Sequence, residues 1–224
     1  MKKIDRYLTF TFDDCLLDGA KKIDKILNPY KATFYIVTGW LGPNPLPITD
    51  ESNINLNHGT LDDWKELSER GHDIGSHSVT HNTHNTHDAK EFDASLEVIK
   101  EIHNGPYSAA FPHNKVLSIT SPYHTIRVGY EKKLSNDLEN VDLHNIISWG
   151  PWPQSLNLFR IKWKVNHVPS KNWLVFNLHS LDGEGWHPWT SRELASIKNY
   201  ALRKGFQIKT MADMYKIIKE TPRI

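Results

Sequence analysis

The chain has 224 residues, of which 38% are hydrophobic, and its 27 Lys+Arg nearly cancel its 26 Asp+Glu. This length suits one well-buried core and is short for two, so residues 1–224 are interpreted as a single domain. The near-zero net charge gives no reason to expect nucleic acid or an anionic membrane as a partner. No apolar run approaches the roughly 20 residues that span a bilayer.

The N-terminus and the cysteine content bear on the compartment. Residues 1–6 include basic side chains, but no apolar stretch follows them as it would in a secretory signal. The single cysteine excludes an intramolecular disulfide framework. Together these features predict a cytoplasmic protein.

The first half of the chain alternates predicted strands with predicted helices. Helical spacing at 23–27 ends at Asn28-Pro29, and a capping-box pattern at Thr60 opens a helix that ends before Gly71. A third helix, with a capping signal at Asp88, carries an apolar stripe from residue 92 to 102. Residues 42–59, with three prolines, are predicted to form a long surface loop. The predicted strands are 8–12, 32–37, 73–76 and 108–111.

The second half is less regular. Residues 146–147 and 158–165 are predicted strands, and 174–178 is a strong one. A capping pattern at 190–193 opens a last helix, which Gly205 closes before a strand at 206–208. Strands that alternate with helices predict a mainly parallel α/β sheet, either open or closed into a barrel.

Polar residues follow several of these strands. Chemistry in parallel α/β folds gathers at the carboxyl ends of the strands. The side chains concerned come directly after strands: Asp13, Asp14, His77, His81, His113 and His179. We therefore expect them to share one end of the sheet.

The adjacent carboxylates Asp13 and Asp14 are the first candidate site residues. Neighbouring residues in a strand point to opposite faces, so both reach one site only where the strand ends. Two close carboxylates repel unless a positive group lies beside them, and a divalent metal bound by one leaves the other free as a base. An ordinary turn or helix start is the alternative interpretation of the pair.

His77 and His81 are four residues apart, a spacing that on a helical turn puts both imidazoles on one face. With Asp14 they give three ligands and open positions for water, which is the form of a catalytic metal site. His84 and His87 are either accessory ligands or solvated histidines. His179 is the candidate second acid/base, because an imidazole can protonate a departing nitrogen.

These residues resemble motifs of the polysaccharide deacetylase (NodB-homology) family. Thr11-Phe12-Asp13-Asp14 resembles its first motif, in which the first Asp is the base and the second a metal ligand. The stretch 71–81 resembles its second motif, whose outer histidines complete the metal triad, and Leu178-His179 resembles the motif that supplies the acid. Residues 32–37 and the closing stretch 205–214 are also similar, so the resemblance spans residues 7–214.

The resemblance implies a distorted (β/α) barrel of seven or eight mostly parallel strands and a divalent metal, with zinc expected. It implies that the backbone amide at His113 stabilises an oxyanion, next to Pro112. It further implies removal of an acetyl group from an acetamido sugar, with Asp13 as base and His179 as acid. Tryptophans in loops after strands are candidates for stacking on sugar rings, with core packing as the alternative for at least two of them: Trp149, Trp152, Trp186 and Trp189.

The chain departs from the family pattern at three places. Cys15 stands where glycine is usual. The third motif, normally Arg-x-Pro-Tyr, reads Ala110-Phe111-Pro112-His113, and Arg127 is the candidate replacement for the missing arginine. The fourth motif is only partly present around 148–149, where Asp142 is a weak candidate for the missing carboxylate.

The predicted function is metal-dependent N-deacetylation of an acetamido sugar in a polysaccharide or its precursor, with surface polysaccharide biosynthesis favoured. Three alternatives remain: a catalytically weak or inactive carbohydrate-binding relative, a hydrolase of another linear or cyclic amide, and a non-haem iron oxygenase. The sequence does not specify an oligomeric state.

Overall fold

The computed structural model describes residues 5–14, 16–82, 88–115, 119, 122–129, 133–150 and 158–220. Its strands are β1 (Arg6–Phe12), β2 (Thr33–Ile36), β3 (Asp73–Ser76), β4 (Ser108–Ala110), β5 (Thr125–Gly129), β6 (Asn136–Asp137), β7 (Ile146–Ser148), β8 (Asn172–Leu178) and β9 (Phe206–Ile208). Its α-helices are α1 (Leu17–Leu27), α2 (Leu61–Glu69), α3 (Asp88–Ile102), α4 (Leu158–Asn166), α5 (Ser191–Arg203) and α6 (Met211–Glu220). Two 3₁₀ turns are η1 (Thr38–Trp40) and η2 (Pro112–Asn114).

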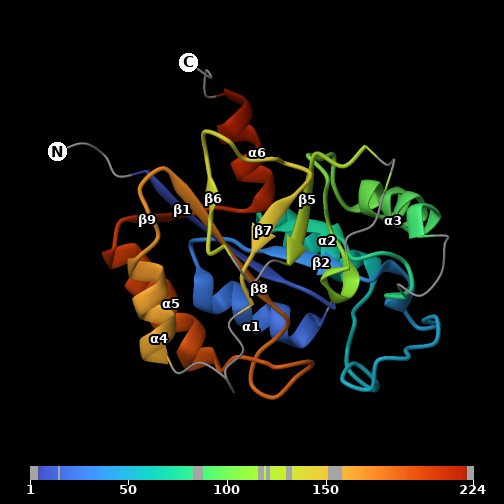
Figure 1. The fold of residues 1–224 in the computed structure, drawn as a ribbon. Coiled ribbons are helices and arrows are strands. Elements are labelled where there is room, and N and C mark those ends of the chain that lie inside the picture. The colour runs from blue at the N-terminus through green and yellow to red at the C-terminus, as the bar shows by residue number, and fades with distance from the viewer. Residues whose placement is uncertain are drawn as a thin grey trace.

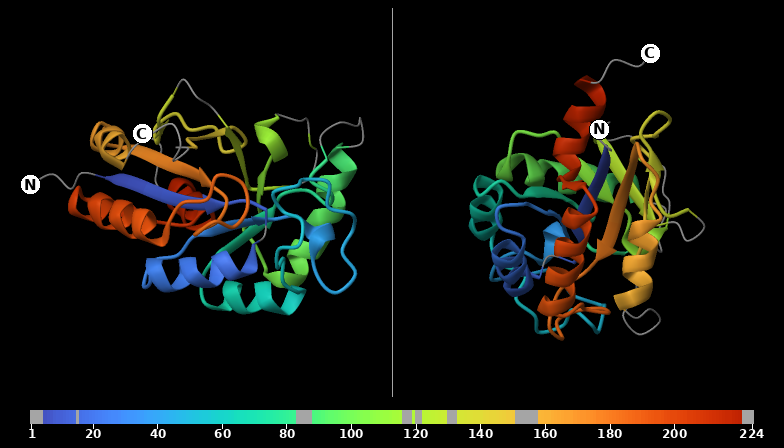
Figure 2. Two further views of the ribbon diagram at one scale, coloured as in Figure 1. Left: turned by 90° about the horizontal axis from the view of Figure 1, so that it is seen from below. Right: turned by 90° about the vertical axis from the view of Figure 1, so that its left-hand side faces the viewer.

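The strands form one sheet that curves into a nearly closed barrel. Its order is β6-β8-β1-β2-β3-β4-β5-β7, β9 also pairs with β1, and only the β6–β8 pair is antiparallel. The gap between β7 and β8 is bridged by Trp149, whose N–H donates to Val175 O (2.8 Å) and whose carbonyl accepts from Asn177 N (3.0 Å). Helices lie around the outside of the strands (Figures 1 and 2). The predicted barrel of mostly parallel strands is confirmed.

Apolar stripes on the helices pack against the strands, as the sequence patterns indicated. Both predicted capping boxes form: Thr60 caps α2 with Asp63, and Thr190 caps α5 with Glu193. Each box satisfies two of the backbone N–H groups that a helix start leaves without partners. Among the described residues, no helix combines the length and the apolar character needed to cross a bilayer.

The prediction of a strand at 158–165 is wrong, because this segment is helix α4. Its apolar residues alternate closely enough to imitate a strand. The helix buries only Ile161 and Val165, which are four residues apart, and leaves Phe159 and Trp163 exposed (73% and 55%). Tertiary packing against α5 therefore overrides the local pattern.

A buried carboxylate ties α1 to α2 and to the start of β3. Asp24 accepts hydrogen bonds from His72 Nε2 (2.9 Å), Lys31 Nζ (3.2 Å) and the Arg70 guanidinium. His72 Nδ1 accepts from Ala32 N (3.1 Å), so the ring donates from Nε2 in its neutral form. Burial alone would raise the pKa of Asp24, but these three donors lower it to about 2.

This depressed pKa predicts a pH-dependent contribution to folding. The pKa of Asp24 is below its unfolded value, so the stabilisation is complete above about pH 4 and is lost as the pH falls toward 2. Asp24→Asn should lower the free energy of unfolding by about 2 kcal/mol at pH 7, and the deficit should shrink between pH 4 and pH 2. Urea denaturation of both proteins across this range measures it. Asp62→Asn, at a position whose side chain is 92% exposed, is the control and should change little. A deficit that does not vary with pH would contradict the assignment.

Candidate active site

The end of β1 delivers two adjacent carboxylates to one place. Asp13 N–H donates to Leu178 O (2.9 Å), which continues the β1–β8 ladder past Phe12. Asp14 then adopts a left-handed backbone (φ 72°), a conformation that Asp tolerates better than most residues. This turn breaks the alternation of the strand, so both buried carboxylates line one cavity.

His77 and His81 come from the turn that follows β3. The four-residue spacing of these histidines predicts a helical turn, but the turn is not helical, because Ser78 and His81 both have positive φ (69° and 62°). It is fixed by Ser78 Oγ, which accepts from His81 N (3.0 Å), and by the Glu91 carboxylate of α3, which accepts from the N–H groups of residues 79 and 80. The two rings nevertheless converge, with centroids 5.0 Å apart.

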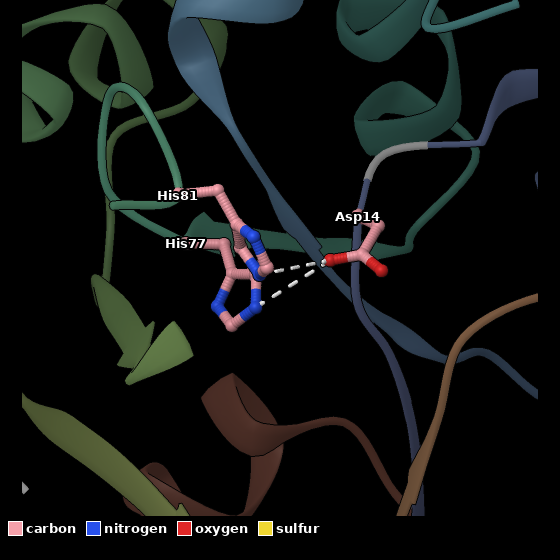
Figure 3. Close-up of side chains that lie close together, drawn as sticks. All are labelled: Asp14, His77 and His81. Atoms are coloured by element: carbon pink, nitrogen blue, oxygen red, sulfur yellow. Dashed lines mark ion pairs between the residues drawn. The ribbon is translucent and has the colours of Figure 1, made fainter. Parts of the chain in front are cut away.

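Asp14, His77 and His81 meet with their ligand atoms within 4.8 Å of one another (Figure 3). Asp14 Oδ1 lies 3.4 Å from His81 Nε2 and 3.7 Å from His77 Nε2. His77 Nδ1 donates to Ala110 O (2.8 Å), which leaves Nε2 turned toward the carboxylates. Asp14 Oδ1 is buried and accepts no hydrogen bond from the described residues. One carboxylate, with a buried oxygen free to accept, and two imidazoles are a ligand set that fits a divalent cation.

The electrostatics of these three groups also fit a cation. Burial and the neighbouring charge of Asp13 raise the pKa of Asp14 to about 8. Burial lowers the pKa of both imidazoles, that of His77 strongly, so both rings are neutral at pH 7 and keep a lone pair. A positive ion between them would relieve the cost of the buried carboxylate, since an opposite charge favours its ionised form.

Arg127 supplies a cation to the other carboxylate. Its Nη2 donates to Asp13 Oδ2 (2.5 Å), its Nη1 to Ser148 Oγ (3.2 Å), and both Arg127 and Asp13 are buried. Arg127 on β5 is the register partner of Ala110 on β4, the position where the resembling motif has arginine. The guanidinium therefore reaches Asp13 from one strand further along the barrel.

The carboxyl ends of the strands enclose a cavity of about 380 Å³. Its walls include both carboxylates, the two imidazoles and His179, which follows β8. Burial lowers the pKa of His179 to about 4, against the raising effect of Asp13. Trp186 borders the cavity, is 42% exposed, and meets the His179 ring edge-on (centroids 5.0 Å apart).

The other predicted site residues are placed differently. His113, with φ 54°, lines the cavity with its ring centroid 4.6 Å from that of His81, whereas Pro112 is buried and does not line the cavity. Trp149 and Trp189 are buried against Phe176, so they form core rather than a sugar platform. Cys15, His84, His87 and Trp152 lie outside the described residues.

Asp142 is not at the site. It accepts a hydrogen bond from His144 N (2.9 Å) in the turn before β7, at the amino end of that strand. Three cavity residues escaped the sequence analysis: Asp50, Asn114 and Asn177. Asn177, a polar residue two positions before His179 in an apolar strand, carried a usable signal. Asp50 lies in the irregular 42–59 loop and Asn114 ends the short 3₁₀ turn η2, so neither carried a periodic signal.

Comparison with known proteins decides the family. The polysaccharide deacetylase family matches residues 1–115, which is just over half of the chain. The matched part includes both the carboxylate motif and the histidine motif. The chain belongs to this family. No curated protein matches the sequence.

Solved structures share the fold of this family member. A family 4 acetyl xylan esterase from Clostridium thermocellum, in complex with cobalt, is 20% identical (TM-score 0.58, covering 97% of this chain and 93% of that chain). Peptidoglycan deacetylase PdaC from Bacillus subtilis is 13% identical (TM-score 0.53, covering 98% and 94%). A family 4 carbohydrate esterase from Streptomyces lividans, in complex with acetate, is 14% identical (TM-score 0.55, covering 89% and 90%). At these identities the similarity establishes the fold.

The three converging ligand atoms predict about one divalent ion per chain. His77→Ala and His81→Ala should each remove the bound metal, because two remaining ligands hold it weakly. Metal content after dialysis, measured by elemental analysis, tests this prediction. His167→Ala, in the turn directly after α4, is the matched control and should leave the metal in place. Full metal retention in both site variants would exclude the triad.

The buried Arg127–Asp13 pair predicts strong coupling between the two residues. Arg127→Met should cost about 3 kcal/mol in the free energy of unfolding of the metal-free protein, because it leaves a buried carboxylate without its cation. Adding Asp13→Asn should recover part of that loss. A double-mutant cycle by urea denaturation measures the coupling. Additive losses would show that the pair does not interact energetically.

Proposed function

We propose that this protein is a metal-dependent hydrolase that removes the acetyl group from an acetamido sugar. The observation that carries the proposal is the convergence of Asp14, His77 and His81 beside a second buried carboxylate, Asp13, in one cavity. The family supports the reaction class. Zinc is the proposed ion, since it is commonly held by nitrogen and carboxylate ligands with a position left open.

Asp13 is the proposed base. When bound, a divalent cation at the triad supplies Lewis acidity toward a carbonyl oxygen and a nearby water. Asp13 takes the proton of the water that attacks the acetyl carbon, while Arg127 holds its Oδ2 in place. The backbone N–H of His113 is the proposed donor to the oxygen that becomes negative. The carbon–nitrogen bond then breaks, and acetate and an amine leave.

His179 is the proposed acid for the departing nitrogen. Its pKa of about 4 keeps the resting ring neutral at pH 7, so the proton that it donates must arrive during the reaction. The proton that Asp13 removes from water balances this requirement, since both side chains line the same cavity. The pair thus moves one proton from water to nitrogen.

The cavity favours a small substrate. Its volume of about 380 Å³ lies within the range of small-molecule sites, and both Asp50 from the 42–59 loop and Trp186 line it. Trp186 can stack on a sugar ring, and Asp50 and Asn114 can accept hydrogen bonds from its hydroxyls. We therefore propose a small acetamido sugar as the substrate, such as a precursor of a surface polysaccharide.

The division of roles between the two carboxylates predicts the behaviour of Asp13→Asn. This variant should keep the metal and lose at least about 100-fold in turnover, because it removes a base and not a ligand. Acetate release and metal content, measured on the same preparation, test both halves. Turnover close to that of the unaltered protein would assign the base elsewhere.

A substrate panel tests the function itself. Acetate release should be faster from nucleotide- or lipid-linked acetamido sugars than from chitin oligomers or peptidoglycan. Faster turnover of the polymers would overturn the proposal that the substrate is a precursor, but it would still support the proposed deacetylase reaction. Acetylated xylan belongs in the panel because a structural neighbour is an acetyl xylan esterase. Release of acetate from none of these compounds, by metal-loaded protein, would overturn the proposed function.

The inactive-relative alternative rested on the missing motif-three arginine. Arg127 argues against this alternative, because its buried guanidinium binds the Asp13 carboxylate in place of the missing arginine. The oxygenase alternative has no structural support beyond the ligand types. Metal analysis together with an oxygen-consumption assay separates it from hydrolysis.

A further inference from the structure

Two buried residues of the 42–59 loop contact the carboxylate ligand Asp14. Asn53 Nδ2 donates to Asp14 Oδ2 (3.3 Å), and His58 Nδ1 lies 3.2 Å from the backbone oxygen of Asp14. His58 Nε2 lies 3.1 Å from Asn53 O, so the three residues form one connected group. Asn53 is 0% and His58 6% exposed, which is unusual for polar residues of a long surface loop.

The loop that carries this pair is anchored on both sides. Leu17 N at the start of α1 donates to Asn57 O (2.8 Å), and Trp64 Nε1 in α2 donates to His58 O (2.9 Å). The Trp40 ring packs against both His58 and His81, at centroid distances of 5.0 and 5.4 Å. One indole therefore sets the distance between the loop and the turn that holds a histidine ligand.

These contacts give the two oxygens of Asp14 different surroundings. Oδ2 is taken by the Asn53 amide, whereas Oδ1 faces His81 and His77 at 3.4 and 3.7 Å. The backbone of Asp14, at φ 72°, is in a region that costs free energy unless neighbours hold it, and His58 contacts its carbonyl. Partners of this kind orient metal ligands in other proteins.

We propose that Asn53 and His58 are positioning residues that present Asp14 to a divalent cation through Oδ1 alone. This inference rests on the metal site of the proposed function. The 42–59 loop then has two roles: it bounds the cavity with Asp50, and it sets the orientation of the ligand from behind. Neither residue lines the cavity itself; both contact Asp14, which does.

The test is cobalt binding to metal-free protein, because cobalt reports its ligands through visible absorption as well as through affinity. Asn53→Leu keeps the size of the side chain and removes the donor, and His58→Phe keeps the ring that packs on Trp40 and removes both ring nitrogens. Ile54→Ala, on the exposed outer side of the same loop, is the matched control. Circular dichroism and thermal unfolding establish that each variant is folded. If only one of the Asn53 and His58 variants folds, that variant alone still tests the proposal.

We expect the cobalt dissociation constant to rise at least about 10-fold in the Asn53 and His58 variants, with an altered absorption spectrum, and to stay unchanged in the control. Folded variants that bind cobalt with unaltered affinity and spectrum would overturn the positioning role while leaving the metal site intact. Failure of the unaltered protein to bind cobalt would overturn the metal site and this inference together. Failure to release acetate with cobalt bound would count against the proposed function alone.

Discussion

The structure depends on how it accommodates two adjacent carboxylates buried at the end of one strand. Asp13 and Asp14 are nearly inaccessible to solvent, and two close negative charges in such a place are costly. The fold treats them differently. Asp13 accepts a hydrogen bond from a guanidinium, whereas the buried Oδ1 of Asp14 faces two neutral imidazoles and accepts no hydrogen bond from the part of the chain that the structure describes. Burial and the neighbouring charge of Asp13 raise the pKa of Asp14 to about 8, because the surrounding side chains do not compensate the charge of this carboxylate.

The barrel makes this arrangement possible because its strands end in register. The ladder continues from Phe12–Leu178 to Asp13, and His77 N donates to Ile36 O (2.8 Å) at the end of the β2–β3 ladder. Parallel pairing therefore brings the residues that follow β1, β3 and β8 to one level. Small backbone departures at Asp14, Ser78 and His81 then turn the side chains inward.

The position of Arg127 shows how a function can be kept while a motif changes. The guanidinium stands on β5, opposite Ala110 of β4 in register, and its Nη2 reaches the carboxylate that the motif arginine is expected to orient. Arginine suits this role because its planar fork can bind Asp13 and Ser148 at once. The guanidinium also lies over the Tyr35 ring, with Cζ 5.2 Å from the ring centroid, which is a favourable cation–π contact.

The sequence by itself determined the fold class, both capping boxes and the strand-end residues that share the cavity, because periodicity, caps and strand ends are local signals. These strand-end residues are Asp13, Asp14, His77, His81, His113 and His179. Only the tertiary structure decided the helix at 158–166, the partner of Asp13, and the burial of Trp149 and Trp189. It also revealed Asn53 and His58, which lie about 40 residues from Asp14 in sequence and in a loop without periodicity. Such contacts depend on how distant segments pack, and a single sequence carries no local pattern for them.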